Sequence, residues 1–142
     1  RIVVDIALKA LSPAINDPTT AVLAIDQLHR LLRQVGRRQL SDESFRDDAG
    51  RPRVIFRTPN WEDFVSLAFS EIRRCGANNF QVARRLRAMI ENLMHTLPAH
   101  RHAALQQQLT LLDREIERQY SLPEDLALAR GSDSQGLGGT KI

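Results

Sequence analysis

Apolar residues recur with a helical period between Pro18 and Val35. Ala21, Ile25, Leu28, Leu32 and Val35 follow one another at alternating steps of four and three residues. This spacing places them on one face and predicts an amphipathic helix, which Gly36 is well suited to end. His29 lies among the polar positions of the same segment, so we expect its side chain to be solvated.

Three later segments, 60–76, 78–97 and 98–120, carry the same pattern and predict further helices. Asn60 is the predicted N-cap of the first, since two acidic residues follow it in the first turn. Asn78 or Asn79 takes the same role in the second. Cys75 falls on the apolar face of the first helix, so we expect it to be buried as a small hydrophobic residue.

The segment 98–120 carries a narrow apolar stripe made of Leu105, Leu109, Leu112 and Ile116. Such a stripe suits either an antiparallel partner inside a helical bundle or the same helix of a neighbouring subunit. A short last helix is predicted from Pro123, a residue favoured at the first helical position, to about Arg130.

The chain begins with a segment, Ile2 to Leu11, that is apolar nearly all round. A helix of this kind is usually buried, so we expect it to be the central helix of the domain. It ends in a corner with two prolines. Pro13 disfavours helical geometry in the residue before it, and Pro18 suits the start of the next helix, with Asp17 as the predicted N-cap.

Residues 43–57 break the helical period, because two short extended segments flank a turn that ends in Gly50. A lone hairpin is marginal in water, so we expect it to lie on the helices or to pair across an oligomer interface. The predicted fold is all-α, in the sense of α-dominant. Residues 1–130 are expected to form a bundle of five to six helices with one small β-hairpin. A flexible tail rich in Gly and Ser, 131–142, follows.

Several polar side chains gather at the corner and make it the first candidate ligand site. They are Ser12, Asn16, Asp17, Thr19 and Thr20. Hard cations such as Mg²⁺ and Ca²⁺ take oxygen ligands of this kind. One carboxylate is few for a cation, however, and each group also has a turn or capping role. We therefore favour a structural joint over a small-ligand site.

Three histidines, His95, His100 and His102, surround a predicted interhelical turn. Zinc needs three or four ligands that converge tetrahedrally, and this spacing matches no motif with a known mechanism. Exposed turn histidines are the preferred interpretation, with a metal site as the weaker alternative.

Acid–base catalysis by carboxylates is the third possibility, with Asp5, Asp17, Asp26 and Asp63 as candidates. None of them forms a pair that differs from helix caps or surface ion pairs. The sequence also lacks a Gly-rich phosphate loop, a nucleophile elbow and an HExxH motif. We therefore expect neither an enzyme nor a cofactor.

The charge balance is mildly basic, with a formal net charge of +3. Acids are interleaved among the arginines and aromatic residues make up 5% of the chain, so stacking platforms for single-stranded nucleic acid are scarce. We expect no nucleic-acid partner, whereas a mildly basic domain beneath an anionic leaflet is a natural arrangement. The single cysteine excludes an internal disulfide.

Two blocks of the chain carry a family resemblance. DIALKALSPAINDPTTAVLAIDQLHRLL (5–32) and, more weakly, RVIFRTPNWEDFVSLAFSEIRRCGA (53–77) resemble the signature of a bacterial family of predicted membrane proteins, domain of unknown function number 2254. Beyond about Asn78 only the layout is similar. The resemblance implies transmembrane helices upstream of Arg1 with a soluble domain attached to them, and it implies no activity, substrate or catalytic residue.

Together these observations predict a non-catalytic soluble domain of a bacterial membrane protein. It would act in oligomeric assembly, as a homo-oligomer, or as a regulatory or binding module. The alternative is a sensor domain that binds a small ligand or a metal, and an enzyme is the less favoured option. We expect the domain at the cell membrane, on its cytoplasmic side if an even number of spans precedes it and the N-terminus lies inside.

Overall fold

The structure, a computed structural model, describes residues 1–41 and 43–133. The helices are α1 (Ile2–Ala10), α2 (Pro18–Gly36), α3 (Trp61–Gly76), α4 (Phe80–Thr96), α5 (His102–Gln119) and α6 (Pro123–Arg130), with a short 3₁₀ turn, η1 (Ala99–Arg101), before α5. The strands β1 (Glu43–Arg46) and β2 (Pro52–Phe56) form an antiparallel pair. The predicted α-dominant fold is confirmed, while most of the predicted flexible tail lies outside the described residues.

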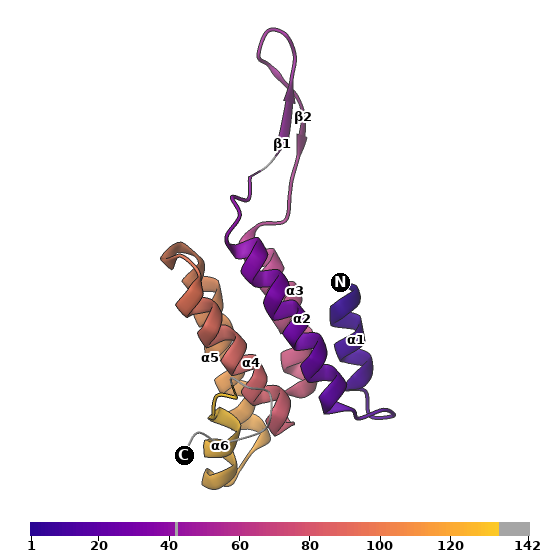
Figure 1. Cartoon of the computed structure of the whole chain (residues 1–142), viewed down its shortest axis with the longest axis vertical. Helices are drawn as coiled ribbons and strands as arrows, with labels where there is room; N and C mark the ends of the chain where they lie inside the picture. The colour runs from indigo at the N-terminus through magenta and orange to yellow at the C-terminus, as the bar shows by residue number, and fades with distance from the viewer. Residues whose placement is uncertain (42, 134–142) are drawn as a thin grey trace.

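The helices form one body from which the hairpin projects (Figure 1). α2 packs against α1, α3 and α4, and α5 packs against α3 and α4. α6 contacts α4 and α5 at the end of the body away from the hairpin. Among the described residues, none of these helices combines the length and the apolar character that crossing a bilayer requires.

Side-chain caps fix the starts of three helices. The Asp17 carboxylate accepts a hydrogen bond from the backbone N–H of Thr20 at 3.0 Å. Asn60 and Asp63 form a reciprocal capping box at the start of α3. Asn79 caps α4 by accepting from the two backbone N–H groups that follow Phe80. The predicted caps Asp17 and Asn60 are therefore confirmed, and the structure selects Asn79 over Asn78.

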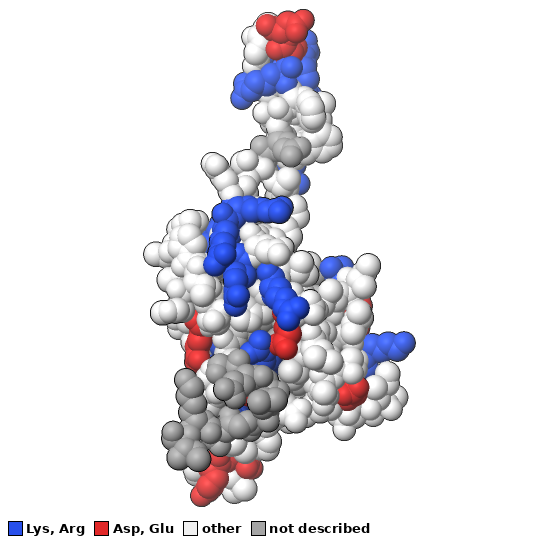
Figure 2. All heavy atoms as spheres, in the orientation of Figure 1, with Lys and Arg blue, Asp and Glu red and all other residues white. Residues whose placement is uncertain are grey.

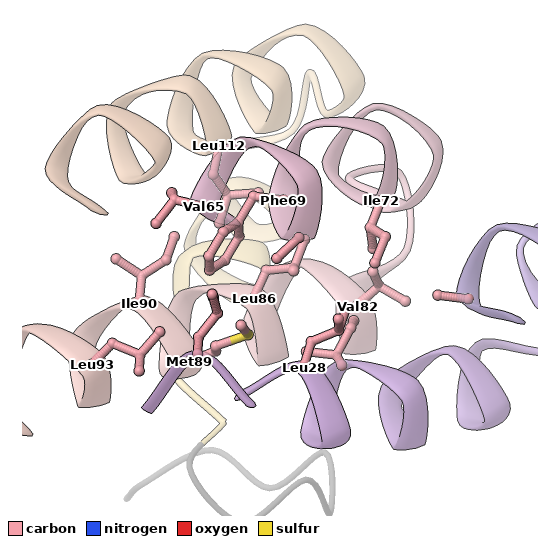
Figure 3. Packing of buried hydrophobic residues seen from close by; sticks show 14 of the residues in the cluster. Leu28, Val65, Phe69, Ile72, Val82, Leu86, Met89, Ile90, Leu93 and Leu112 are labelled. Atoms are coloured by element: carbon pink, nitrogen blue, oxygen red, sulfur yellow. The ribbon is translucent and has the colours of Figure 1, made fainter. Parts of the chain in front are cut away.

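The hydrophobic core lies where α3, α4 and α5 meet α2 (Figure 3). Its largest fully buried side chains include Trp61, Phe69, Ile72, Leu86, Met89, Ile90 and Leu93. The α5 stripe belongs to this core, since Leu105, Leu112 and Ile116 are fully buried and Leu109 is partly buried. Of the two partners proposed for the stripe, the one inside the bundle is confirmed.

The first helix lies differently from the prediction. α1 lies on the outer side of α2 and α3 rather than at the centre (Figure 1). Only Val4, Ala7 and Ala10 are buried, whereas Ile2 is 78% and Ile6 47% exposed. A sequence that is apolar all round does not indicate which face is covered, and small side chains on one face let α1 pack closely against α2.

For two side chains the predicted burial is wrong. Cys75 is exposed, because Ile72 and Gly76, four residues apart, occupy the buried face of α3 beside it. His29 is buried, because α4 crosses its face of α2 and places Asn92 against the imidazole. The helical period of a single segment gives the wrong burial for a residue at the edge of an apolar face, because the packing of a second helix decides which edge is covered.

A glycine allows the chain to turn sharply between α3 and α4. A Cβ atom on Gly76 would overlap the side chain of Val82 and would lie 3.1 Å from a methyl carbon of Leu11. Any other residue at this position would require the Val82 side chain or the start of α4 to shift.

Candidate functional site

The corner between α1 and α2 is closed by its own hydrogen bonds. The backbone N–H of Asp17 donates to the carbonyl of Ala10 at 2.8 Å, and Asn16 adopts a left-handed conformation with φ of 46°. The Ser12 hydroxyl donates to the carbonyl of Lys9 at 2.8 Å. The Ser12 side chain therefore binds the end of α1, whereas that of Asp17 binds the start of α2.

The Asp17 carboxylate has two donors from one residue. The Thr20 hydroxyl donates to it at 2.5 Å, in addition to the Thr20 backbone N–H. These hydrogen bonds, the hydroxyl first, hold the pKa of Asp17 below its ordinary value. The side chains of Asn16 and Thr19 are exposed, and the backbone N–H of Thr19 makes a smaller contribution to the lowered pKa of Asp17. A ligand role for these five residues stays a prediction.

The predicted histidine cluster does not converge. His102 Nε2 lies 2.9 Å from the carbonyl oxygen of Leu97, whereas His95 and His100 are exposed. Over residues 1–41 and 43–133, no three His, Cys, Asp or Glu side chains are grouped so that they hold a metal ion. The weak zinc alternative therefore gains no geometric support.

The hairpin presents an aromatic face to solvent. Phe45 pairs with Val54 across the two strands, and Phe56, two residues after Val54, shares their face. The Phe45 and Phe56 rings meet edge to face, with their centroids 6.0 Å apart. All three side chains are exposed, Phe45 by 61%. Of the two predicted environments of the hairpin, packing on the helices is therefore wrong, and pairing across an oligomer interface stays a prediction.

The hairpin turn is held by a carboxylate. Asp47 accepts from the backbone N–H groups of Ala49 and Arg51 and from the Nε atoms of Arg51 and Arg53 at 3.0 and 2.9 Å. These bonds lower the pKa of Asp47, the Arg51 backbone N–H most strongly. Gly50 supplies the positive φ, 75°, that the turn needs. Polar groups thus order a tip that no apolar packing supports.

An apolar groove opens on the body at the end from which the hairpin leaves. It has a volume of about 210 Å³ and lies between α1, α2 and α3. Its lining consists of Arg1, Val4, Leu28, Leu31, Leu32, Val35, Phe64, Leu67 and Ala68. Leu31 and Leu67 are exposed on its rim. The C-terminal half of α2 and the N-terminal half of α3, which flank the hairpin in the sequence, form most of this groove.

Charged groups border the groove. Arg1 lies at one end, where its guanidinium is 2.8 Å from the carboxylate of Asp5 and 2.5 Å from that of Glu71. Glu62 and Asp63 are exposed at the start of α3. The sequence analysis did not identify the aromatic face of the hairpin, although the period-two alternation of strand residues is the signal that could have found it. The groove had no such signal, since three helices distant in sequence build it.

Comparisons with known proteins agree with the resemblance in the two sequence blocks. The model of the family described as "Predicted membrane protein (DUF2254)" matches residues 1–92. An uncharacterised protein of Mycobacterium bovis is 31% identical over 133 residues, which cover 93% of this chain and 26% of that protein. Uncharacterised proteins of two Mycobacterium tuberculosis strains match with the same identity and coverage.

The chain thus spans about a quarter of the length of these curated relatives. No solved structure matches it. The family match covers the corner, the hairpin, the groove and the greater part of α4. The chain belongs to the DUF2254 family of predicted membrane proteins.

Proposed function

We propose that this chain is a non-catalytic assembly domain of a membrane protein and that it joins two copies reciprocally. The hairpin of each copy lies in the apolar groove of the other. The exposed aromatic face formed by Phe45, Val54 and Phe56 carries the proposal, because isolated hairpins are marginal in water and, among residues 1–41 and 43–133, no side chains of its own body cover this face. The same proposal places the domain beneath the cytoplasmic leaflet, which suits its net charge of +3.

The relative position of the two surfaces supports a two-fold arrangement. The groove lies at the base of the hairpin, at the end of the body from which the hairpin projects (Figure 1). A two-fold axis across this base points the hairpins in opposite directions, so that each one reaches the body of the other copy. Such an interface is isologous and closes at two copies.

Dimensions and chemistry support the same pairing. A five-residue strand such as β2 extends roughly 17 Å. The groove follows α2 from Leu28 to Val35, two helical turns or roughly 10 Å, so the hairpin is long enough to cover it. Aromatic side chains in an apolar pocket are typical of the residues that dominate binding energy at interfaces.

The charges on the hairpin and at the start of α3 differ in sign. Glu62 and Asp63 are exposed in the first turn of α3, whereas Asp5 and Glu71, also exposed, are already bound to Arg1 of the groove lining. The hairpin contributes Arg46, Arg51, Arg53 and Arg57, of which Arg51 and Arg53 are also bound to Asp47. Opposite charges at the rim increase the rate of association and disfavour other orientations.

Native mass spectrometry and sedimentation velocity of the 142-residue chain test the proposal. We expect a dimer, and we expect the hairpin variant Phe45→Ser/Phe56→Ser to be a monomer. Neither ring is part of the core, so this variant keeps the helical fold. Leu31→Glu, on the groove rim, should also give a monomer. Leu23→Glu is the matched control, since Leu23 is also an exposed leucine on α2, 60% against 48% for Leu31, and lies outside the groove.

Mixing the two monomeric variants sharpens the test. The hairpin of the Leu31→Glu chain and the groove of the hairpin variant are both intact, so a mixture retains one of the two contacts and should form heterodimers. A wild-type chain that stays monomeric at every concentration would exclude the proposal. A dimer that survives both variants would place the interface elsewhere.

A further inference from the structure

A second site, unrelated to the hairpin and the groove, lies between α2 and α4. It is an open polar hollow of about 260 Å³, lined by Asp26, His29, Arg30, Arg33, Arg85, Ala88 and Asn92. Three of these side chains are guanidinium groups and one is a carboxylate. The hollow therefore has an excess of positive charge even when His29 is counted as neutral. Ala88, a small residue on α4, leaves the space open.

A hydrogen-bond network orders the wall of the hollow. His29 Nε2 lies 3.0 Å from the side-chain oxygen of Asn92, to which Arg33 also donates at 2.7 Å. On the other side of the ring, an Arg85 nitrogen lies 3.5 Å from His29 Nδ1. Arg33 Nη2 also lies 3.2 Å from Nε2, but it donates to the nearer Asn92 oxygen. Because amide oxygens accept and guanidinium groups donate, the Asn92 and Arg85 contacts favour the neutral imidazole with its proton on Nε2.

Burial and charge agree with this assignment. Burial lowers the pKa of His29, and the positive charges of Arg33 and Arg85 lower it further, against the opposing effects of the Asn92 hydrogen bond and of Asp26. The imidazole is therefore neutral at neutral pH. It faces Arg85 through Nδ1 and shares the Asn92 oxygen with Arg33 without adding a charge of its own. The site is arranged before any ligand arrives.

Arg30 and Arg33 retain hydrogen-bonding capacity for a ligand, whereas Arg85 is engaged with protein groups, including the backbone carbonyl of Asp133, to which its Nη1 donates at 3.3 Å. Within the described part of the chain, the buried Nε atom of Arg33 has no hydrogen-bond partner. Arg30 is exposed at the mouth of the hollow. Arg85 is held in place by Asp26, whose carboxylate accepts from its Nε at 2.5 Å. An unsatisfied buried donor of this kind costs stability unless a ligand or water satisfies it.

We propose that this hollow binds a phosphate oxyanion through the guanidinium groups of Arg30 and Arg33, while Arg85, held by protein groups, adds positive charge to its wall. Guanidinium groups donate in a planar fork that matches the geometry of phosphate oxygens, and such charge-assisted bonds are stronger than neutral ones. The phosphate belongs to a soluble small molecule or to a lipid headgroup, since both present the same oxygens. The inference does not depend on dimerisation.

The surroundings extend the positive surface along α2. Next to the hollow, Arg37, Arg38 and Arg101 line a second recess at the C-terminal end of the helix. On the face of the molecule drawn in Figure 2, Lys and Arg side chains gather in the middle, over the upper part of α2. A field of one sign around the hollow raises the local concentration of anions and speeds their capture.

Titration of the full 142-residue chain with inorganic phosphate at about pH 7.5, followed by the side-chain NMR signals of Arg33 and His29, tests the site. We expect saturable shifts of both signals. Phosphate also offsets the positive field at the imidazole, so the pKa of His29 should rise on binding. Arg33→Gln should weaken binding about tenfold or more, because it removes a charge-assisted contact.

Two further variants keep the test decisive. Arg30 is exposed, so Arg30→Gln leaves the His29–Asn92 contact intact and weakens binding even if Arg33→Gln fails to fold. Arg114→Gln removes an exposed arginine of α5, which contributes no lining residue, and should keep the affinity within about twofold. An equal loss in this control would show diffuse charge attraction and overturn the proposal.

Sedimentation with phosphatidylcholine vesicles, alone or mixed in equal parts with phosphatidic acid, separates the two sources. If the chain binds the acidic vesicles and Arg33→Gln or Arg30→Gln abolishes this binding, the phosphate is that of a lipid. Binding of inorganic phosphate without vesicle binding assigns a soluble one. Failure of both to bind, or binding that is indifferent to both variants, would exclude the site.

Discussion

The indole Nε1 of Trp61 donates a hydrogen bond to the backbone carbonyl of Arg101 at 2.9 Å and so joins the first residue of α3 to the turn before α5. The indole is 1% exposed, and the guanidinium of Arg101 lies 5.4 Å from the ring centroid. This contact fixes the end of the body nearest the hairpin, where α3 begins.

Replacing Trp61 with Phe should destabilise the chain by about 1–3 kcal/mol, because it leaves the Arg101 carbonyl unpaired and removes part of a buried ring. Urea denaturation followed by far-UV circular dichroism measures the loss. Leu23→Ala, a reduction at an exposed residue outside both the core and the proposed interface, should change the free energy of unfolding by less than about 0.5 kcal/mol. Equal effects of the two changes would contradict the role of the Trp61 contact.

Asp17→Ala should lower the melting temperature by roughly 4 °C, because the start of α2 loses its cap. Asn is an equally good N-cap, so Asp17→Asn should retain most of the stability. The difference between wild type and Asp17→Ala should depend on pH. The pKa of Asp17 is lowered in the folded state, so the stabilisation is complete above the ordinary value of 3.8 and is lost as the pH falls below it.

Scanning calorimetry between neutral pH and about pH 2.5 measures this difference. A melting temperature that Asp17→Ala leaves unchanged at neutral pH would show that the corner does not depend on its cap.

His29 should make the chain less stable in mild acid. The pKa of His29 is lowered in the folded state, so the unfolded chain binds the proton more tightly. Its contribution is therefore complete above the ordinary value of 6.5 and is lost as the pH falls below that value. Urea denaturation at about pH 8 and pH 5.5 should show the loss in wild type and a smaller one in His29→Gln.

The exposed His95 supplies the control, since His95→Gln should leave the pH dependence of wild type unchanged. If His29→Gln and wild type lose stability in parallel, other groups cause the pH dependence and the imidazole is not neutral by burial.

Gly76→Ala should destabilise the chain by about 1–3 kcal/mol, since the new methyl group overlaps the side chain of Val82. Val82→Ala creates room at the same place, so the double variant should lose less than the sum of the two single changes. A double-mutant cycle by urea denaturation measures this coupling. Strict additivity would mean that the backbone relaxes and that the close approach of α3 and α4 is not required.

Local signals in the sequence predicted the fold well. Asp17, Asn60 and the residues after them define helix starts within a single turn, so the cap and the beginning of each helix follow from neighbouring residues alone. The stripe on α5 likewise predicted a buried face. The hairpin was predicted from the break in the helical period, and its turn from Gly50.

Burial at the edges of faces was not predictable in the same way. His29 lies next to the apolar face of α2, and it is covered only because Asn92, 63 residues later, packs against it. Asp26 and Arg85 pair from two helices that are equally distant in sequence. The polar hollow between α2 and α4 and the apolar groove both depend on such long-range contacts. The candidate residues of the corner could be found in the sequence because they are neighbours along the chain.

The exposure of Cys75 gives each chain a single chemically distinct position. The sequence contains one cysteine, and its thiol lies on the outer surface of α3, near the end of the helix opposite the hairpin. A thiol reagent therefore attaches one spin label or fluorophore per copy, so that the number of labels counts the copies in any assembly. The distance between two labels would then measure how those copies are oriented.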